Sequence, residues 1–567
     1  MCPGSSIPAI PHLPMFRAHA FLGALCLIVL PAQAHPPRPQ DPAAALQNFE
    51  KWLQDYGSGK IELRGTTGSD RAGIEQMRLV FRTVAQGDDL AAAQALWHAA
   101  VVELPEGMDK HKLLRSCVNL VRDEAKRLIA GIADDGVDDW LFTMSFRRTK
   151  GADKQGDIGK MTALEILGMR APKGIAEKLL AKVNSLPIPE RSAAILALER
   201  SQSAEALPLL VKLLKERAVE VRLAAVSTLC GILSFYSDET QENQGNNDVS
   251  KEWTPIVVEA LKKLLAREKS WQVKSATIDG LVRLKNHQSI PVLIAAYKSE
   301  AKLGKRKNVF LMENFHDALA GLTGVDMPRN RPQFWEKFWE ENGSGFRYAP
   351  KPKKGEKAKK KDSGGYVKYF NLNVRTKRIL FIIDFSGSMR EKVRLKTRYA
   401  GNNEHVKYEL VKRELEKVIR ALPKDAVCNV IFFNHEVSVW REGKGGQPAL
   451  VPMTDANKSD LLQYLWETNP GGSTNLYGAL EKGLSMGSRG VFDKYYKTAY
   501  DSLFVLSDGA PSAGKITDTN LILREVAKIN KLRRIRIHSI VFGDATNNLR
   551  FMKGLAEQSG GQFHHVQ

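Results

Sequence analysis

An aspartate and two serines follow one another at alternate positions, at the end of an apolar run in residues 381–389. The three residues are Asp384, Ser386 and Ser388. The apolar run predicts a buried strand, so the three oxygen-bearing side chains would lie at its carboxyl end. Carboxylate and hydroxyl oxygens are hard donors that suit Mg²⁺ or Mn²⁺. The pattern therefore predicts one part of a divalent-metal site.

Two later loops carry further oxygen donors. Thr474 lies in a glycine-rich turn, 471–476, that opens a predicted helix, and Asp508 follows the predicted strand Leu503–Ser507. In an open α/β sheet, ligand sites form where parallel strands end and their loops gather. We therefore expect both loops to lie near the first three donors.

The C-terminal region, 366–567, alternates short apolar strands with amphipathic helices. The expected strands are Arg378–Asp384, Val427–Phe433, Glu436–Trp440, Leu503–Ser507, Arg536–Phe542 and Gln562–Val566. The expected helices lie near Tyr408–Ala421, Ser459–Glu467, Leu476–Met486, Leu521–Lys531 and Leu549–Gln558. This alternation predicts a doubly wound, mostly parallel, Rossmann-like α/β sheet. The pair at 427–440, joined through Asn434 and His435, predicts a hairpin with one antiparallel edge strand.

The order of the donors, Asp-x-Ser-x-Ser, then a threonine, then an aspartate, resembles the von Willebrand factor A (VWA) domain. The resemblance covers residues 366–567 and fills all five positions of that family's metal-ion-dependent adhesion site (MIDAS). These positions are Asp384, Ser386, Ser388, Thr474 and Asp508. The alternative for the first three alone is a serine-rich turn beside a structural aspartate.

The resemblance implies how such a site works. The two serines and Thr474 would ligate the metal directly, and Asp384 and Asp508 would act largely through waters. Two carboxylates and three hydroxyls leave a coordination position open on Mg²⁺, which prefers octahedral oxygen coordination. In the family that position takes a carboxylate from a partner protein, so we expect an acidic protein ligand.

A basic strip departs from the family pattern directly after the first donors. Arg390, Lys392, Arg394, Lys396 and Arg398 recur at every second position, so an extended segment would carry them on one face. The insertion runs to about Lys407. A basic strip beside the metal would steer an acidic ligand or anionic surface toward it. The alternative is a solvated loop.

Residues 43–345 predict helix after helix. Four similar segments begin at residues 159, 190, 221 and 273, so that the first three starts are 31 residues apart. Partner helices lie between them, and Pro208, Pro255 and Pro291 are each expected near the start of one. Paired helices at this period resemble HEAT-like repeats, over about residues 155–300, and predict an all-α solenoid. A non-repetitive helical bundle is the alternative.

The N-terminus predicts export. Arg17 and His19 precede the apolar stretch Ala20–Leu30, and an A-x-A signal ends at Ala34, as in a signal peptide over residues 1–34. We expect a protein of bacterial type that is periplasmic, secreted or on the cell surface, with no transmembrane helix in the mature chain. Cys117, Cys230 and Cys428 would remain as buried hydrophobes rather than a disulfide framework.

The formal net charge of +21 favours acidic partners. Part of this charge lies in residues 348–365, which are rich in lysine, proline and glycine and predict a solvated linker between the two regions. The alternative is that the basic residues 351–361 bind an anionic surface. The chain is therefore expected to be multidomain, with the helical region and the α/β region joined by a tether.

No set of catalytic residues emerges from the sequence, which has no H-E-x-x-H, G-x-S-x-G or C-x-x-C pattern. We therefore expect a non-enzymatic adhesion protein that binds its partner through the metal. Helical repeats joined to an A domain also resemble the Ro ribonucleoprotein, which binds RNA, but a signal peptide and the absence of an aromatic-interleaved basic stripe argue against nucleic acid. A third alternative is a solenoid scaffold in which the metal only stabilises the fold.

Overall fold

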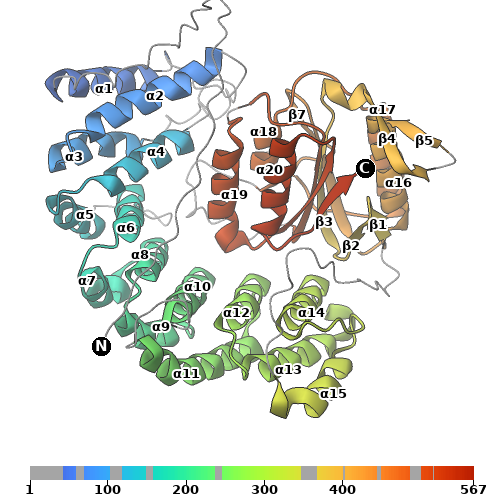
Figure 1. The fold of residues 1–567 in the computed structure, drawn as a ribbon, viewed down its shortest axis with the longest axis horizontal. Coiled ribbons are helices and arrows are strands. Elements are labelled where there is room, and N and C mark those ends of the chain that lie inside the picture. Colours follow the sequence, from blue (N-terminus) through green and yellow to red (C-terminus); the bar gives the residue numbers. More distant parts are fainter. Residues whose placement is uncertain are drawn as a thin grey trace, which may run out of the picture. The chain divides into compact units, whose positions relative to one another are not determined.

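The apolar runs of the C-terminal region form a seven-stranded, mostly parallel sheet (Figure 1). Its strands are β3 (Arg378–Asp384), β6 (Val427–Phe433), β7 (Val437–Val439), β8 (Val451–Pro452), β9 (Ser502–Ser507), β10 (Arg536–Phe542) and β11 (Phe563–Val566). Their order is β11-β10-β9-β3-β6-β7, and β8 pairs with the other end of β6. The predicted doubly wound sheet is therefore confirmed, and β7 is the antiparallel edge strand expected from the hairpin at 427–440.

This computed structural model describes residues 42–58, 60, 69–102, 118–147, 157–236, 246–346, 367–399, 402–443, 448–484, 500–514 and 516–567. The predicted signal peptide (1–34), Cys117, and the linker 348–365 with its basic residues 351–361 lie outside these ranges. Within the ranges, residues from Pro42 to Gln567 form one compact unit.

Two layers of helices cover the sheet, and the alternation along β3 shows which helix covers which face. Leu380 and Ile382 pack with the apolar residues of α18 (Leu476–Gly483), α19 (Thr519–Arg533) and α20 (Thr546–Glu557). Phe381 and Ile383 pack with those of α16 (Lys407–Ala421) and α17 (Asp455–Glu467). A strand that is buried on both faces is apolar throughout, which is why β3 could be predicted from its composition.

Five strands were not predicted as separate elements, among them the two-residue β8. β1 (Val367–Tyr369) and β2 (Leu372–Val374) form an antiparallel ribbon whose turn holds Phe370 and Asn371 at positive φ. β4 (Lys392–Tyr399) and β5 (Asn402–Val406) form a second antiparallel ribbon, directly before α16. Three-residue strands offer too short an alternation to detect, and a phenylalanine is an unusual residue for a left-handed turn.

The N-terminal region is helical, as predicted. Its α-helices are α1 (Pro42–Gly57), α2 (Ser69–Ala85), α3 (Leu90–Ala100), α4 (Val118–Gly131), α5 (Gly136–Phe146), α6 (Ile158–Arg170), α7 (Ile175–Lys182), α8 (Ile188–Ser201), α9 (Leu207–Leu213), α10 (Val219–Tyr236), α11 (Asn246–Arg267), α12 (Trp271–Leu284), α13 (Ser289–Ala301), α14 (Val309–Thr323) and α15 (Pro332–Asn342).

The four repeated segments each form a helix, and these helices pack on one another in order. The segments that begin at 159, 190, 221 and 273 lie in α6, α8, α10 and α12, and each of these helices contacts the next. The partner helices α7, α9, α11 and α13 alternate with them along the chain. Stacking of equivalent helices is the arrangement expected of a solenoid.

The prediction that Pro255 lies near the start of a helix is wrong. Pro208 and Pro291 do lie in the first turn of α9 and α13, but Pro255 lies inside α11, which already begins at Asn246. The polar residues before Pro255 had suggested a loop. Because proline has no N–H, α11 lacks one backbone hydrogen bond at this position.

One helix among the described residues, α10, is long and apolar enough to cross a membrane by length and composition. Its apolar side chains, including Leu229 and Leu233, are buried against its neighbours. Cys230 on the same helix and Cys428 on β6 are free and buried, as the sequence had suggested.

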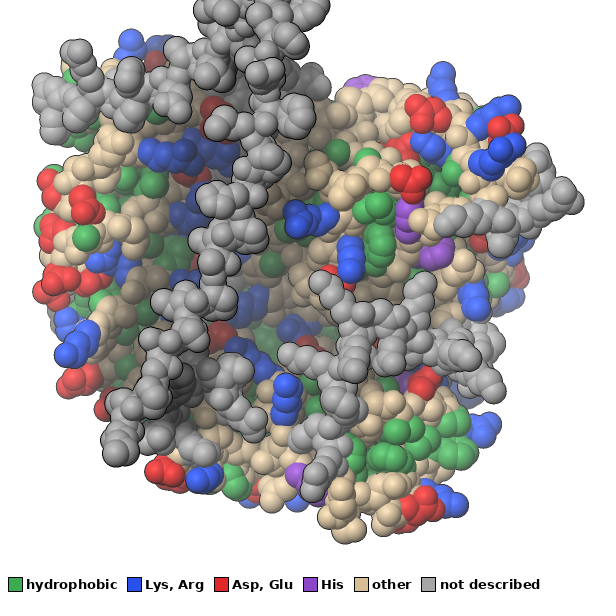
Figure 2. All heavy atoms as spheres, in the orientation of Figure 1, with side chains coloured by type: hydrophobic (Ala, Val, Ile, Leu, Met, Phe, Trp, Pro, Cys, Tyr) green, Lys and Arg blue, Asp and Glu red, His purple; other side chains and the backbone are tan. Residues whose placement is uncertain are grey.

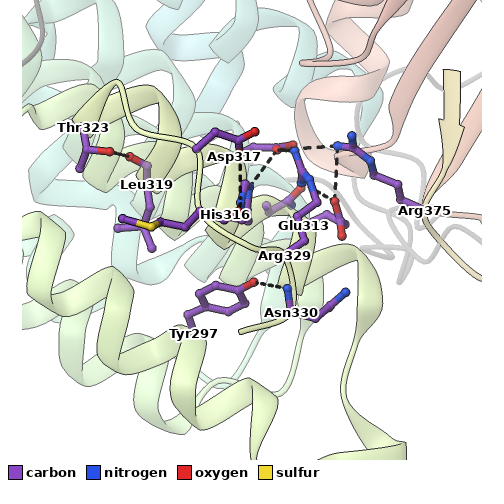
Figure 3. A network of polar contacts seen from close by, with 12 residues as sticks. Tyr297, Glu313, His316, Asp317, Leu319, Thr323, Arg329, Asn330 and Arg375 are labelled. Atoms are coloured by element: carbon purple, nitrogen blue, oxygen red, sulfur yellow. Dashed lines mark hydrogen bonds and ion pairs between the residues drawn. The ribbon is translucent and has the colours of Figure 1, made fainter. Parts of the chain in front are cut away.

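Ion pairs join side chains of the helical region to side chains that precede or belong to the sheet region. Arg375 pairs with Glu313 of α14 at 3.5 Å, and Arg536 of β10 pairs with Asp317 at 2.9 Å. Arg329 also contacts Glu313 and Asp317, so the two carboxylates are shared among several guanidinium groups (Figure 3). Burial raises the pKa of Asp317, but a hydrogen bond with His316 and the charges of Arg536 and Arg329 outweigh it and hold the pKa well below its usual range.

Candidate metal site

The first predicted donor, Asp384, lies at the carboxyl end of β3 in the middle of the sheet. Its side chain is completely buried. One carboxylate oxygen accepts the backbone N–H of Ser386 at 2.8 Å, and the other accepts the hydroxyl of Ser507 at 2.6 Å. Because β3 pairs with β6 on one side and β9 on the other, the backbone that carries Asp384 is fixed from both sides.

The two serines and Asp508 lie beside it. A short 3₁₀ turn, η6 (Gly387–Arg390), follows Ser386 and turns the chain back across the end of the sheet. The hydroxyl oxygens of Ser386 and Ser388 are 3.2 Å apart, and the Ser388 hydroxyl donates to Asp508 Oδ1 at 2.8 Å. Asp384, Ser386, Ser388 and Asp508, four of the five predicted donors, are thus joined in a chain of direct hydrogen bonds.

Thr474 joins the cluster through its loop. The backbone N–H of Gly387 donates to the carbonyl of Gly472, and the N–H of Gly471 donates to the carbonyl of Phe385, each at 2.8 Å. Gly472 has φ +73°, and a side chain there would collide with the ring of His435. The Thr474 side chain is 5% exposed, and this loop lies against the loop that carries the two serines.

The third loop is tied to the second. The backbone N–H of Thr474 donates to the Ser512 hydroxyl at 3.0 Å, and the Thr474 carbonyl accepts from the N–H groups of Ser512 and Ala513. All three loops that carry predicted donors are therefore linked by backbone hydrogen bonds. Such links hold the donors in place before any ligand arrives, which is the condition for a preorganised site.

The first residue of the basic strip has a different role from the one expected. Arg390 ends the 3₁₀ turn instead of belonging to an extended segment, and its guanidinium donates to the Pro470 carbonyl at 2.9 and 2.6 Å. The extended segment begins at Lys392. On this strand Lys392 and Arg394 are exposed, whereas Leu395 is buried, so the predicted alternation holds there. Lys392 contacts Glu404 on the facing strand at 3.2 Å.

A lysine that was not predicted as a site residue reaches the same cluster. Lys407 begins α16, and its ammonium nitrogen lies 2.8 Å from Asp508 Oδ2. The ammonium also lies 2.8 Å from Glu391 Oε2 and 3.4 Å from the Ser388 carbonyl. The Lys407 residue is 8% exposed, so this ion pair is largely shielded from solvent.

The two carboxylates of the cluster, Asp384 and Asp508, differ in how their negative charge is compensated. Burial and the nearby negative charge of Asp508 together raise the pKa of Asp384 to about 6, although hydrogen bonds from Ser386 and Ser507 oppose the shift. Burial lowers the pKa of Lys407, but the hydrogen bonds and negative charges of Asp508 and Glu391 outweigh this effect, so its pKa is raised. Lys407 therefore neutralises the charge of Asp508, while the buried carboxylate of Asp384 accepts hydrogen bonds from a hydroxyl and a backbone N–H.

These residues fit a hard divalent cation. Two carboxylates and three hydroxyl residues lie on three linked loops, and the buried Asp384 would gain a counter-charge from a cation at this position. Among the residues that the structure describes, no group of three or more His, Cys, Asp and Glu side chains could hold a metal ion. The five predicted donors offer carboxylate and hydroxyl oxygens, which are typical ligands of Mg²⁺ or Mn²⁺ rather than of zinc.

Sequence reasoning missed Ser507 and Lys407. Ser507 directly precedes Asp508, so a hydroxyl at the end of a central strand was an available signal. Lys407 offered none, because a lysine at a helix start usually lies in solvent. Its role depends on how the ribbon β4–β5 returns the chain to Glu391, which only the fold reveals.

Comparison with known proteins agrees with this architecture. A sequence model of the von Willebrand factor type A domain matches residues 399–565, which include Thr474 and Asp508. The C-terminal region is a VWA domain. The match begins after Asp384, Ser386 and Ser388, so these three donors rest on the motif and on the geometry described above. A model of the PBS lyase HEAT-like repeat matches residues 190–216, which form α8 and α9.

Curated relatives match the VWA domain at low identity. The chain is 24% identical to inter-alpha-trypsin inhibitor heavy chain H3 of Bos taurus over 203 residues, which cover 35% of this chain and 20% of the relative. It is 26% identical to von Willebrand factor A domain-containing protein 3A of Homo sapiens, over 33% of this chain and 13% of the relative. The chain thus spans about a fifth or less of these relatives.

Solved structures were also compared. A von Willebrand factor type A structure from Catenulispora acidiphila matches with a TM-score of 0.25 and 17% identity, over 33% of this chain and 38% of that one. The PilB minor pilin from Streptococcus sanguinis matches with a TM-score of 0.23 and 13% identity, over 35% and 58% of the two chains.

Proposed function

We propose that this chain is an exported, non-enzymatic interaction protein that binds an acidic partner through a divalent metal held by its VWA domain. The observation that carries the proposal is the meeting of the donors of three loops at one end of the sheet, around the buried Asp384. The family resemblance supports the same reading, because VWA domains commonly hold a divalent metal at these positions. The HEAT-like helices, within residues 43–345, would serve as the scaffold.

In this proposal Ser386, Ser388 and Thr474 would hold Mg²⁺ or Mn²⁺ directly, and Asp384 and Asp508 would hold it largely through waters. The metal, when bound, supplies a positive charge and an open coordination position to a carboxylate of the partner. The chain itself fixes the donors. Asp384 is held by Ser507, and the first two loops are joined through Gly387 and Gly472.

Exposed basic side chains beside the site support an acidic partner. Lys392 and Arg394 lie on β4, a short distance along the chain from Ser388, and both are exposed. Positive charge around a binding site raises the association rate of an acidic ligand, and added salt weakens the effect. Arg390 is excluded from this set because its guanidinium binds Pro470.

The metal proposal is tested by calorimetric titration of the chain with MgCl₂ and MnCl₂. We expect one site per chain in the unmodified protein, lost on addition of EDTA and abolished in Asp384→Ala. The matched control is Asp425→Asn, which removes an exposed aspartate that pairs with Lys377 just before β6 and β3, at the other end of these strands from Asp384. Metal binding that persists unchanged in Asp384→Ala would contradict the proposed donor set.

The partner proposal needs a separate test. The chain is immobilised, and a protein extract from the organism that encodes it is passed over it in the presence of Mg²⁺. Bound proteins are then released with EDTA. We expect an acidic protein to be retained by the unmodified chain and not by Asp384→Ala. Retention that survives both EDTA and the substitution would mean that another surface binds the partner.

Export is tested with a reporter fused to residues 1–40. We expect the reporter outside the cytoplasm, with the first 34 residues removed. Cytoplasmic retention would contradict the proposed location and would favour an intracellular ligand such as RNA.

A further inference from the structure

Lys407 places a positive charge at the candidate metal site without being one of its donors. Its ammonium nitrogen lies 2.8 Å from Asp508 Oδ2, and Asp508 also accepts the Ser388 hydroxyl. A metal held by Ser388 and Asp508 would lie within a few ångströms of this ammonium group, and two cations at such a distance repel each other.

A second acceptor for the ammonium is already in place. Glu391 Oε2 lies 2.8 Å from the same nitrogen, and the Glu391 side chain is 66% exposed. The backbone also joins the two residues, because the N–H of Lys407 donates to the Glu391 carbonyl at 3.0 Å. The ammonium can thus give up Asp508 and keep an ion pair with Glu391, at the edge of the site.

We propose that Lys407 is a tethered counter-cation of the metal site, which neutralises Asp508 when no metal is bound and shifts to Glu391 when one binds. This inference rests on the proposed metal site and concerns how tightly that site takes its ion. The ion pair of Lys407 with Asp508 stabilises the metal-free domain, because it neutralises a buried carboxylate. The same ion pair must be broken when the metal binds, so it lowers the affinity for the metal.

The inference predicts a gain of affinity from the loss of a lysine. Lys407→Met keeps the length of the side chain and removes its charge, so we expect Mg²⁺ to bind about tenfold or more tightly in a calorimetric titration of the full chain. Lys407→Arg keeps the charge and is expected to bind nearly as the unmodified chain does. Lys417→Met removes an exposed lysine of the same helix, paired with Glu414, and serves as the control for net charge.

Substitution of Glu391 should change the Mg²⁺ affinity in the opposite direction, and it leaves Lys407 in place. Glu391→Gln removes the alternative partner of the ammonium, so the metal is expected to bind about threefold more weakly. In the Lys407→Met background the same substitution should have a smaller effect, because the ammonium that it positions is gone. An equal effect in both backgrounds would overturn the proposed shift between Asp508 and Glu391. Should Lys407→Met not fold, Glu391→Gln alone decides, and unchanged or tighter metal binding would overturn the inference.

The remaining outcomes separate this inference from the proposed function. If the unmodified chain binds Mg²⁺, Asp384→Ala does not, and Lys407→Met binds no more tightly than the unmodified chain, the site stands and the counter-cation role is wrong. If neither the unmodified chain nor Lys407→Met binds Mg²⁺ or Mn²⁺, the metal site is wrong, and the inference falls with it.

Discussion

Several buried ionisable residues of the C-terminal region lie at the ends of strands, and their environment decides their charge. Asp384, at the carboxyl end of β3, was predicted from its spacing to Ser386 and Ser388 because alternate oxygen donors after an apolar run are easily recognised. Lys407 could not be predicted, since its partner Asp508 lies about a hundred residues further along the chain and approaches it only in the folded domain.

Asp501 lies at the opposite end of the sheet and gives a prediction for pH. Burial raises its pKa to about 7, although Thr376 and Arg378 oppose the shift. A raised pKa means that the folded protein binds the proton more tightly than the unfolded chain, so this residue makes the protein less stable as pH rises from about 4 to about 7.

We expect Asp501→Asn to remove this loss. The free energy of unfolding of the unmodified chain, compared with that of Asp501→Asn, should fall by about 3 kcal/mol between pH 4 and pH 7. His538 contributes the opposite dependence, because burial lowers its pKa to about 3, and it is present in both proteins. Chemical denaturation at a series of pH values measures the free energy of unfolding of both proteins. If the difference between them does not change with pH, the pKa of Asp501 is not raised in the folded protein.

Elements of this fold differ in how well the sequence predicts them. β3, β6 and β10 have the residue bounds that were expected, because each is rich in apolar residues and is buried on both faces. The ribbon β4–β5 was expected only as an extended basic segment. Its pairing depends on cross-strand contacts such as Lys392 with Glu404, and these do not appear as a periodic pattern along one strand.

Arg390 lies between two elements and gives a prediction at this scale. It ends the turn that carries the two serines, and it binds the carbonyl of Pro470 just before the loop of Thr474. Arg390→Met should therefore let these two loops separate. We expect a loss of about 1–3 kcal/mol in the free energy of unfolding and a several-fold weaker Mg²⁺ affinity, although Arg390 is not a donor.

The control for this prediction is Arg394→Met, an exposed arginine on the neighbouring strand β4. It removes the same charge without touching the loop of Thr474. Loss of the positive charge alone would strengthen metal binding, because two cations repel each other. If Arg390→Met binds Mg²⁺ as tightly as Arg394→Met does, the loops do not depend on the hydrogen bonds of Arg390.

At the scale of the whole molecule, buried ion pairs join residues that are far apart in the sequence. Lys528 of α19 lies 2.7 Å from Asp123 of α4 and 3.0 Å from Glu165 of α6. Burial opposes its charge, but the two carboxylates and Glu525 hold the pKa of Lys528 well above its usual value. No sequence pattern relates residues separated by 405 positions, so the predicted tether between two regions gave no hint of these contacts.

Lys528→Met should leave the carboxylates of Asp123 and Glu165 with Lys126 but without the cation from α19. We expect a loss of about 2–3 kcal/mol in the free energy of unfolding, less than for a buried charge that loses every partner, because Lys126 still pairs with both carboxylates. Thermal unfolding measures the loss, and Lys553→Met, on the exposed side of α20, is the control. The triple variant with Asp123→Asn and Glu165→Gln should recover part of the stability. An unchanged melting temperature in Lys528→Met would contradict this network.

The ribbon β4–β5 begins and ends at nearly the same point. Lys392 faces Val406, and the next residue, Lys407, is bonded to the carbonyl of Glu391. The two ends of the ribbon are therefore fixed by their own pairing, and an insertion between Tyr399 and Asn402, which pair at its other end, should leave both in place. A fluorescent label or a peptide graft inserted there would modify this domain without moving Lys407 or Glu391.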